Sequence, residues 1–196
     1  MANFKTMIRT LMFVFVVLFC ATTFYYYTEQ GNARAEANIP KLPDFEHTNN
    51  QQFINNVVQC VNYIEHNTTD VYPVNLELLL AQAALESGWG NSRFARVGKN
   101  LFGIRTYDLQ EPHMLPSNNP KKWGVKVYSH ECDSVLNYMQ VLNNGGAYEK
   151  YRELMNNGEN DPYILVETLD AYASDKYYFS KIKSILTKIR SEYAIK

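Results

Sequence analysis

The run NLELLLAQAALES, which spans Asn75 to Ser87, leaves its local structure little choice. Its leucines and alanines recur at the three- and four-residue spacing of a helix face. Asn75 is a favourable N-cap residue, and Gly88 suits the left-handed position that often follows a helix. We therefore expect a helix that begins after Asn75 and ends before Gly88.

Glu86 is unusual in this helix because it lies in the last turn. The unsatisfied carbonyl groups there disfavour a negative charge by a few tenths to about 1 kcal/mol. A surface glutamate on a frayed helix end is one explanation. The other is functional, because the helix end, the apolar neighbours Leu85 and Trp89, and the absence of lysine or arginine within four residues all favour the protonated form. A carboxyl group that stays protonated near neutral pH can serve as a general acid.

The rest of the chain after residue 50 is also mostly helical in pattern. Two short strands are expected at Asn100 to Ile104 and Gly124 to Tyr128, separated by a polar, proline-containing loop from Thr106 to Lys122. Helices are expected over Gln51 to His66, Ser92 to Val97, Ser129 (N-cap) to Asn143, Ala147 to Asn156, Asp161-Pro162 to Ala173, and Asp175 or Tyr178 to Tyr193. This pattern predicts an α+β, mostly helical domain, with a ligand cleft between the helices and a small β lobe.

The N-terminal segment differs from the rest. Lys5 and Arg9 precede an uncharged apolar stretch from Leu11 to Tyr27. This arrangement is typical of a signal peptide cleaved before Glu36, and an uncleaved membrane anchor is the alternative. The expected organisation is a signal peptide or anchor over residues 1–35, a linker over 36–49 and a domain over 50–196. Either reading places the working domain outside the cytoplasm, in the periplasm or cell envelope.

Composition excludes several classes of function. The 196 residues carry a formal charge of −1, with acids and bases interspersed, so nucleic acid is not an expected partner. Metal-ligand spacing is absent from the scattered histidines, and Ser87 lacks a G-x-S-x-G context. We expect no metal, no cofactor and a monomer. Cys60 and Cys132 are expected to be buried free thiols rather than a disulfide.

Four segments occur together in an order and spacing that resemble the bacterial glucosaminidase family. They are AQAALESGWGNSRFA (Ala81 to Ala95), NLFGI (Asn100 to Ile104), VYSHECDSVLNYM (Val127 to Met139) and YASDKYYFSKI (Tyr172 to Ile182). The resemblance covers the chain from about Asn50 and is to peptidoglycan N-acetylglucosaminidases of the autolysin and flagellar rod-hydrolase type, with the third segment most similar to Bax-type members. It implies a lysozyme-like fold that hydrolyses β-1,4 glycosidic bonds of peptidoglycan glycan strands.

The resemblance also implies roles for individual residues. Glu86 matches the catalytic acid, and Tyr172 matches a tyrosine across the cleft. Glycosidases usually need a second carboxylate. Glu111 is preferred over Asp108, while Glu131 and Asp133 are more simply explained as favourable charges at a helix N-terminus.

Other residues are candidates for binding or for structural roles. Trp89, Trp123, Tyr128 and Asp108 are the candidates for contact with substrate. Phe102 is expected in the core, and Asp175 is expected to cap the final helix. Two alternative functions are a lytic transglycosylase and a non-catalytic glycan-binding or scaffold module.

Overall fold

The computed structural model describes residues 2–37, 39–70, 72–117, 122–172 and 175–195. The chain forms two compact units, Met1–Pro40 and Lys41–Lys196. The first unit is essentially one helix, α1 (Ala2–Ala37). No helix within the described ranges combines the length and apolar content that crossing a membrane demands. The signal peptide, the anchor and the domain boundaries stay predictions.

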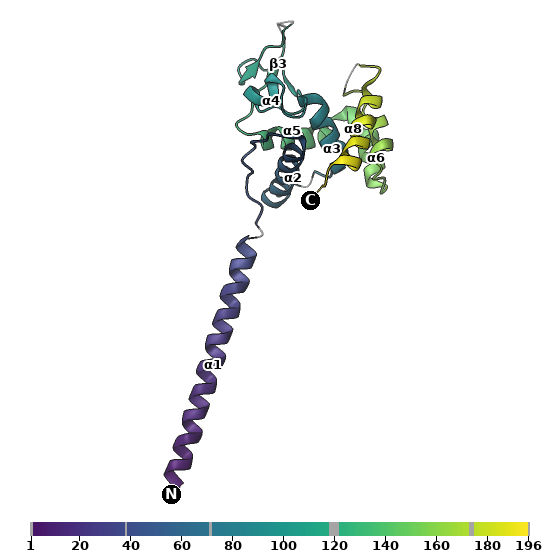
Figure 1. Ribbon diagram of the computed structural model, residues 1–196. Helices are drawn as coiled ribbons and strands as arrows, with labels where there is room; N and C mark the ends of the chain where they lie inside the picture. The colour runs from purple at the N-terminus through teal and green to yellow at the C-terminus, as the bar shows by residue number, and fades with distance from the viewer. Residues whose placement is uncertain (1, 38, 71, 118–121, 173–174, 196) are drawn as a thin grey trace. The chain divides into compact units, whose positions relative to one another are not determined.

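The second unit is built around helix α3 (Leu76–Ser87), whose side chains are buried from Leu78 to Ala84. The predicted caps are both confirmed, since the Asn75 side chain accepts a hydrogen bond from the Leu78 N–H and Gly88 adopts the left-handed conformation with φ of 59°. Helix α3 packs against α8 (Tyr178–Glu192), and the two lie side by side in Figure 1.

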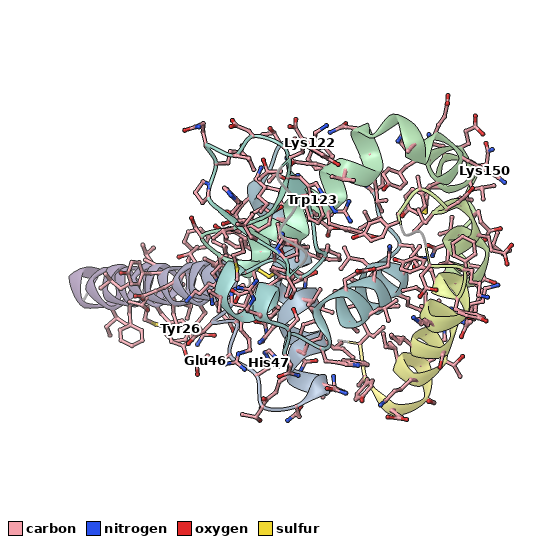
Figure 2. All side chains as sticks on the ribbon, turned by 90° about the horizontal axis from the view of Figure 1, so that it is seen from above. Tyr26, Glu46, His47, Lys122, Trp123 and Lys150 are labelled. Carbon is pink, nitrogen blue, oxygen red and sulfur yellow. A yellow bond between two sulfur atoms is a disulfide. The ribbon has the colours of Figure 1, made fainter. Side chains whose placement is uncertain are left out.

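A second pair of helices completes the core. Helix α2 (Asn50–Asn67), as predicted, has one buried apolar face and packs against α5 (Glu131–Asn144). Cys60 of α2 and Cys132 of α5 form a disulfide, drawn in Figure 2 as a bond between sulfur atoms, with their Cα atoms 4.9 Å apart. The expectation of two free thiols was therefore wrong. The reason is tertiary, because the bridge depends on how two helices distant in sequence pack together.

The β lobe follows helix α4 (Arg93–Gly98). It is a three-stranded antiparallel sheet in the order β1-β3-β2, and α4 packs against β2 and β3. Figure 1 shows α4 and β3 together at one end of this unit. The strands are β1 (Arg105–Thr106), β2 (His113–Met114) and β3 (Gly124–Lys126).

The strand predicted at Asn100 to Ile104 does not form. The Asn100 side chain instead accepts hydrogen bonds from the N–H groups of Phe102 and Ile104, and it donates to the carbonyls of Ile104 and Lys126. A side chain thus satisfies backbone groups that a sheet ladder would otherwise satisfy. Gly103, at φ of 65°, bends the segment. Strand β2 lies within the predicted loop.

The C-terminal half contains short helices before α8. They are η1 (Gly146–Tyr148), α6 (Glu149–Asn156), α7 (Pro162–Leu165) and η2 (Val166–Thr168). The helix predicted from Asp161 is shorter than expected, because it tightens to a 3-10 turn and ends at Thr168; its predicted end, Ala173, lies outside the described residues. Helix α5 is capped by His130 rather than Ser129, with its ring accepting a hydrogen bond from the Cys132 N–H.

Residues 41–49, here called the strap, lead into α2 without regular secondary structure. Three side-chain hydrogen bonds attach the strap to the domain, two donated by domain residues and one donated by a strap residue. His130 donates from Nε2 to the Pro43 carbonyl at 3.0 Å, and Asn56 donates to the Glu46 carbonyl at 2.9 Å. His47, next to Glu46 in Figure 2, donates to the Trp89 carbonyl at 3.0 Å. The strap is therefore fixed to the domain along most of its length.

Candidate active site

A cleft of about 620 Å³ opens between the helical body and the base of the β lobe. Its walls come from the end of α3, the segment Phe102 to Arg105, α5, and the residues Ala171, Tyr172 and Asp175 that precede α8. Its polar lining consists of two acids, one base and three tyrosines among the described residues: Glu86, Asp175, Arg105, Tyr107, Tyr148 and Tyr172. This is the position at which the sequence predicted a ligand cleft.

Glu86 reaches the cleft from the last turn of α3. Burial raises the pKa of its carboxyl group above the ordinary value of 4.5, and a hydrogen bond with the Tyr178 hydroxyl lowers it by a smaller amount. Burial wins because the charged form loses hydration that one neutral donor replaces only in part. Glu86 thus combines access to a cleft with a stabilised protonated form, which are the two requirements for a proton donor.

Tyr178 is itself held by a buried polar chain that the sequence reading missed. Gln82 lies one turn before Glu86 on α3 and is fully buried. Its amide N–H donates to the Tyr178 hydroxyl at 2.7 Å, and its amide oxygen accepts from Tyr138. A glutamine inside an otherwise apolar helix, four residues before the acid, was the available signal, because a buried amide must find partners.

Tyr172 lies in the same cleft as Glu86. Its hydroxyl group donates to the Phe102 carbonyl at 3.1 Å, and its ring stacks on Tyr178 with centroids 5.9 Å apart. Burial raises the pKa of Tyr172 well above its usual range, so the hydroxyl remains a donor at physiological pH. Glu86 and Tyr172 are distant along the sequence, and the fold brings both to one cleft.

Glu111 lies in the lobe and is not among the described residues that line the cleft. One of its carboxylate oxygens accepts a hydrogen bond from Thr106 at 2.9 Å and lies 3.3 Å from the Lys126 ammonium. Successive side chains of a strand point to opposite faces. Arg105 lines the cleft, so the next residue, buried Thr106, holds Glu111 toward the other face of the sheet.

The predicted substrate-contact residues also lie outside the described lining of this cleft. Trp89 packs between Phe53 and Tyr193, at centroid distances of 6.1 and 5.6 Å. The Tyr128 hydroxyl donates to Asn137 at 2.7 Å. Asp108 is an exposed turn residue that accepts from the Gln110 N–H, and Trp123 lies beneath Arg105. Their contact with substrate stays a prediction.

Asp175 is in the cleft, although the sequence suggested only a capping role. Its carboxylate accepts hydrogen bonds from Lys181 and from the Tyr177 N–H, and these bonds hold its pKa below the usual range. Asp175 therefore shapes the turn into α8 and also presents an ionised carboxylate at the cleft. Glu131 and Asp133 lie in the first turn of α5, the position expected for favourable charges. Glu131 also forms an ion pair with Lys99 at 2.8 Å, and Asp133 completes a capping box with His130.

Cys60, His130 and Cys132 place potential ligand atoms within 4.8 Å of one another. The two sulfur atoms form the disulfide, so neither is a thiolate, which is the form that binds metal. Both His130 ring nitrogens already have hydrogen-bond partners. This cluster is better explained as a structural clamp between α2, α5 and the strap.

Comparison with known proteins identifies relatives that are named as a peptidoglycan hydrolase and a glucosaminidase. The chain is 33% identical over 135 residues to the peptidoglycan hydrolase FlgJ of Vibrio parahaemolyticus, which covers 60% of this chain and 42% of the relative. It is 28% identical over 127 residues to the exo-glucosaminidase LytG of Bacillus subtilis, covering 60% of this chain and 45% of the relative. The chain thus spans less than half the length of these curated relatives.

A solved structure supports the same relationship at the level of the fold. The catalytic domain of the autolysin Auto from Listeria monocytogenes superimposes with a TM-score of 0.55 and 25% identity, covering 83% of this chain and 94% of that domain. The family described as mannosyl-glycoprotein endo-beta-N-acetylglucosaminidase matches residues 64–191, which include Glu86, the lobe and Tyr172. With both the four ordered segments and the fold in agreement, this chain belongs to the glucosaminidase family.

Proposed function

We propose that this protein hydrolyses β-1,4 glycosidic bonds in the glycan strands of peptidoglycan, as an endo-β-N-acetylglucosaminidase that uses Glu86 as general acid. The observation that carries the proposal is the state of Glu86. It lies in a cleft of about 620 Å³, and burial raises its pKa. Such a carboxylic acid can protonate the leaving oxygen of a glycosidic bond near neutral pH.

Tyr172 acts across the cleft from this acid in our proposal. Its hydroxyl donates to the Phe102 carbonyl, and the hydroxyl oxygen can in addition accept a hydrogen bond from a water molecule or a sugar hydroxyl. The exposed ring of Tyr107, on the lobe side of the cleft, offers a flat face for a sugar ring.

Two acids compete for the role of the second carboxylate. Asp175 lines the cleft and is held ionised by Lys181, so its position and charge suit the role without any rearrangement. Glu111, the sequence-based choice, would have to leave Thr106 and Lys126 and approach the cleft when substrate binds. Widely different environments for two carboxyl groups in one cleft are typical of acid and base pairs in glycosidases.

The N-terminal unit fits an exported enzyme. A basic start followed by an apolar stretch is the pattern of a signal peptide or of an N-terminal anchor, and either would deliver the domain to the cell envelope. We propose that the domain works there as a monomer.

Digestion of purified peptidoglycan by the full chain tests the proposal. We expect products with reducing N-acetylglucosamine ends, identified by mass spectrometry, and loss of these products in Glu86→Gln with the circular dichroism spectrum unchanged. Anhydro sugar ends would instead identify a lytic transglycosylase. Binding of glycan without turnover by the parent protein, and equally by Glu86→Gln, would identify a non-catalytic module.

A further inference from the structure

Arg105 is a cation fixed at the edge of the cleft. It is the first residue of β1, it is exposed, and it lines the cleft. Its guanidinium carbon lies 4.0 Å from the centroid of the Trp123 ring. Stacking on an aromatic face orients the guanidinium plane and leaves the N–H groups at its edge free to bind an anion.

The charges of the cleft make this cation distinctive. Among the described lining residues, Arg105 is the sole base, beside the acids Glu86 and Asp175. Asp175 is paired with Lys181, and the protonated form of Glu86 is favoured. No salt bridge or hydrogen bond joins the Arg105 guanidinium to any residue in the described part of the chain. Its charge therefore remains available to a ligand in the cleft.

The proposed substrate carries a matching group. The glycan of peptidoglycan contains muramic acid, a sugar with a lactyl ether that ends in a carboxyl group. That group is either a free carboxylate or the attachment point of a stem peptide with carboxylates of its own. Neutral polymers of N-acetylglucosamine contain neither. A guanidinium group can bind a carboxylate through two parallel hydrogen bonds.

We propose that Arg105 binds a carboxylate of the muramic-acid unit and so makes the cleft prefer carboxylated glycan to neutral glycan. This inference rests on the proposed function, because it assumes that the cleft holds a glycan strand. Tyr107, two residues along the chain, also lines the cleft and is exposed. The lobe would then offer one residue for the sugar ring and one for its acidic substituent.

The test compares Arg105→Gln and Arg105→Lys with the parent chain on four substrates. These are peptide-free peptidoglycan strands, the same strands with carboxyl groups converted to amides, peptide-bearing strands, and N-acetylglucosamine hexamer. We expect Arg105→Gln to raise KM on carboxylated strands about five- to tenfold, the lower range for a charge-assisted pair at an exposed site, with kcat little changed. We expect no change in KM on the amidated strands or the hexamer.

Lys122→Gln is the matched control. Lys122 is an exposed base next to Trp123 on the lobe, labelled beside it in Figure 2, and does not line the cleft. The Lys122→Gln variant should leave the KM values for all four substrates unchanged. Arg105→Lys should recover only part of the loss, because an ammonium group cannot form the paired hydrogen bonds. Added salt should raise the KM of the parent on carboxylated strands more than that of Arg105→Gln.

The remaining outcomes separate the possibilities. A rise in the KM of Arg105→Gln that is confined to peptide-bearing strands would support the proposal and place the carboxylate on the stem peptide. A rise in KM on peptide-free strands would place the carboxylate on the lactyl group. An equal rise in KM on carboxylated and neutral substrates, or no rise on any of them, would overturn the proposal, because Arg105 would then only cover Trp123. If the parent chain cleaves none of the four substrates, it is the proposed function that fails.

Discussion

Tyr172 donates a hydrogen bond from its hydroxyl group to the backbone carbonyl oxygen of Phe102. Phe102 is buried and stacks on Tyr138 of α5, with ring centroids 4.1 Å apart, in the segment that leads into the lobe. Tyr172 follows η2 on the other side of the cleft. The Tyr172 side chain thus connects the two walls of the cleft that Glu86 also lines.

Tyr172→Phe should therefore lower kcat more than it lowers stability. We expect a loss of at least about tenfold in kcat, because a hydrogen bond to a group that develops charge contributes about 1.5–3 kcal/mol. Tyr163→Phe is the control, since it removes a hydroxyl that bonds to Thr187 away from the cleft, and it should leave kcat unchanged. If Tyr172 were only structural, both variants would shift the melting temperature and neither would change kcat.

Replacing Glu86 should change stability in a pH-dependent way. Because burial raises its pKa above 4.5, the stability that its protonated form contributes is fully present below that value and is lost as pH rises through the higher native pKa. Glu86→Gln cannot ionise, so the variant should be more stable than the parent at pH 8 and nearly equal to it at pH 4. Urea unfolding at both values measures this. Glu65→Gln, at an exposed position of α2, should show no such pH-dependent gain.

Tyr178→Phe should move the basic limb of the pH profile of kcat/KM to higher pH. The hydrogen bond from Tyr178 lowers the pKa of Glu86, so its removal lets that pKa rise further. The variant should also lose about 1–3 kcal/mol of stability, because the buried Gln82 amide loses its acceptor.

Tyr138→Phe provides the control for this shift. Its hydroxyl also bonds to Gln82, but Tyr138 is not among the groups that shift the pKa of Glu86. It should lower stability without moving the basic limb. An unmoved limb in Tyr178→Phe would mean that Glu86 does not control the basic side of the profile.

The disulfide should contribute much of the stability of the domain. It closes a loop with a sequence separation of 72 residues, for which the chain-entropy argument gives about 4 kcal/mol. The double variant Cys60→Ala, Cys132→Ala should lose a comparable amount in urea unfolding. Adding reductant should destabilise the parent and leave the variant unaffected. If reductant has no effect on the parent, the two thiols are not bridged in solution.

Asp175→Asn should lower kcat by about a hundredfold or more if Asp175 is the second carboxylate, because that role requires a negative charge. Glu111→Gln should then cost much less. The opposite order would assign the role to Glu111.

Lys181→Ala keeps the Asp175 carboxylate but removes the group that lowers its pKa. The acidic limb of the pH profile of kcat should therefore move to higher pH, while the maximal rate is largely kept.

Local signals predicted the helical body well. The apolar face of α2 and both caps of α3 follow from residues within a few positions of one another, and they were read correctly. The strand expected after Asn100 failed because the Asn100 side chain bonds to the backbone that a strand would have used. Propensity and periodicity cannot register a competitor of that kind.

The site was predictable as far as its motifs reached. Glu86 and Tyr172 were singled out and lie in one cleft. The place of Asp175 in that cleft, the position of Glu111 behind β1 and the Cys60–Cys132 bridge were not foreseen. Each depends on the packing of segments that are distant in sequence, which spacing along the chain does not encode.

The attachment of the strap to the domain shortens the free chain between α1 and the domain. An extended linker over residues 36–49 would span roughly 45–50 Å at about 3.5 Å per residue. Because His130 binds the carbonyl of Pro43, only the five residues 38–42 separate α1 from the first of these hydrogen bonds. Their greatest reach is about 20 Å. If α1 anchors the protein in a membrane after export, the domain can act only on cell-wall material close to that membrane.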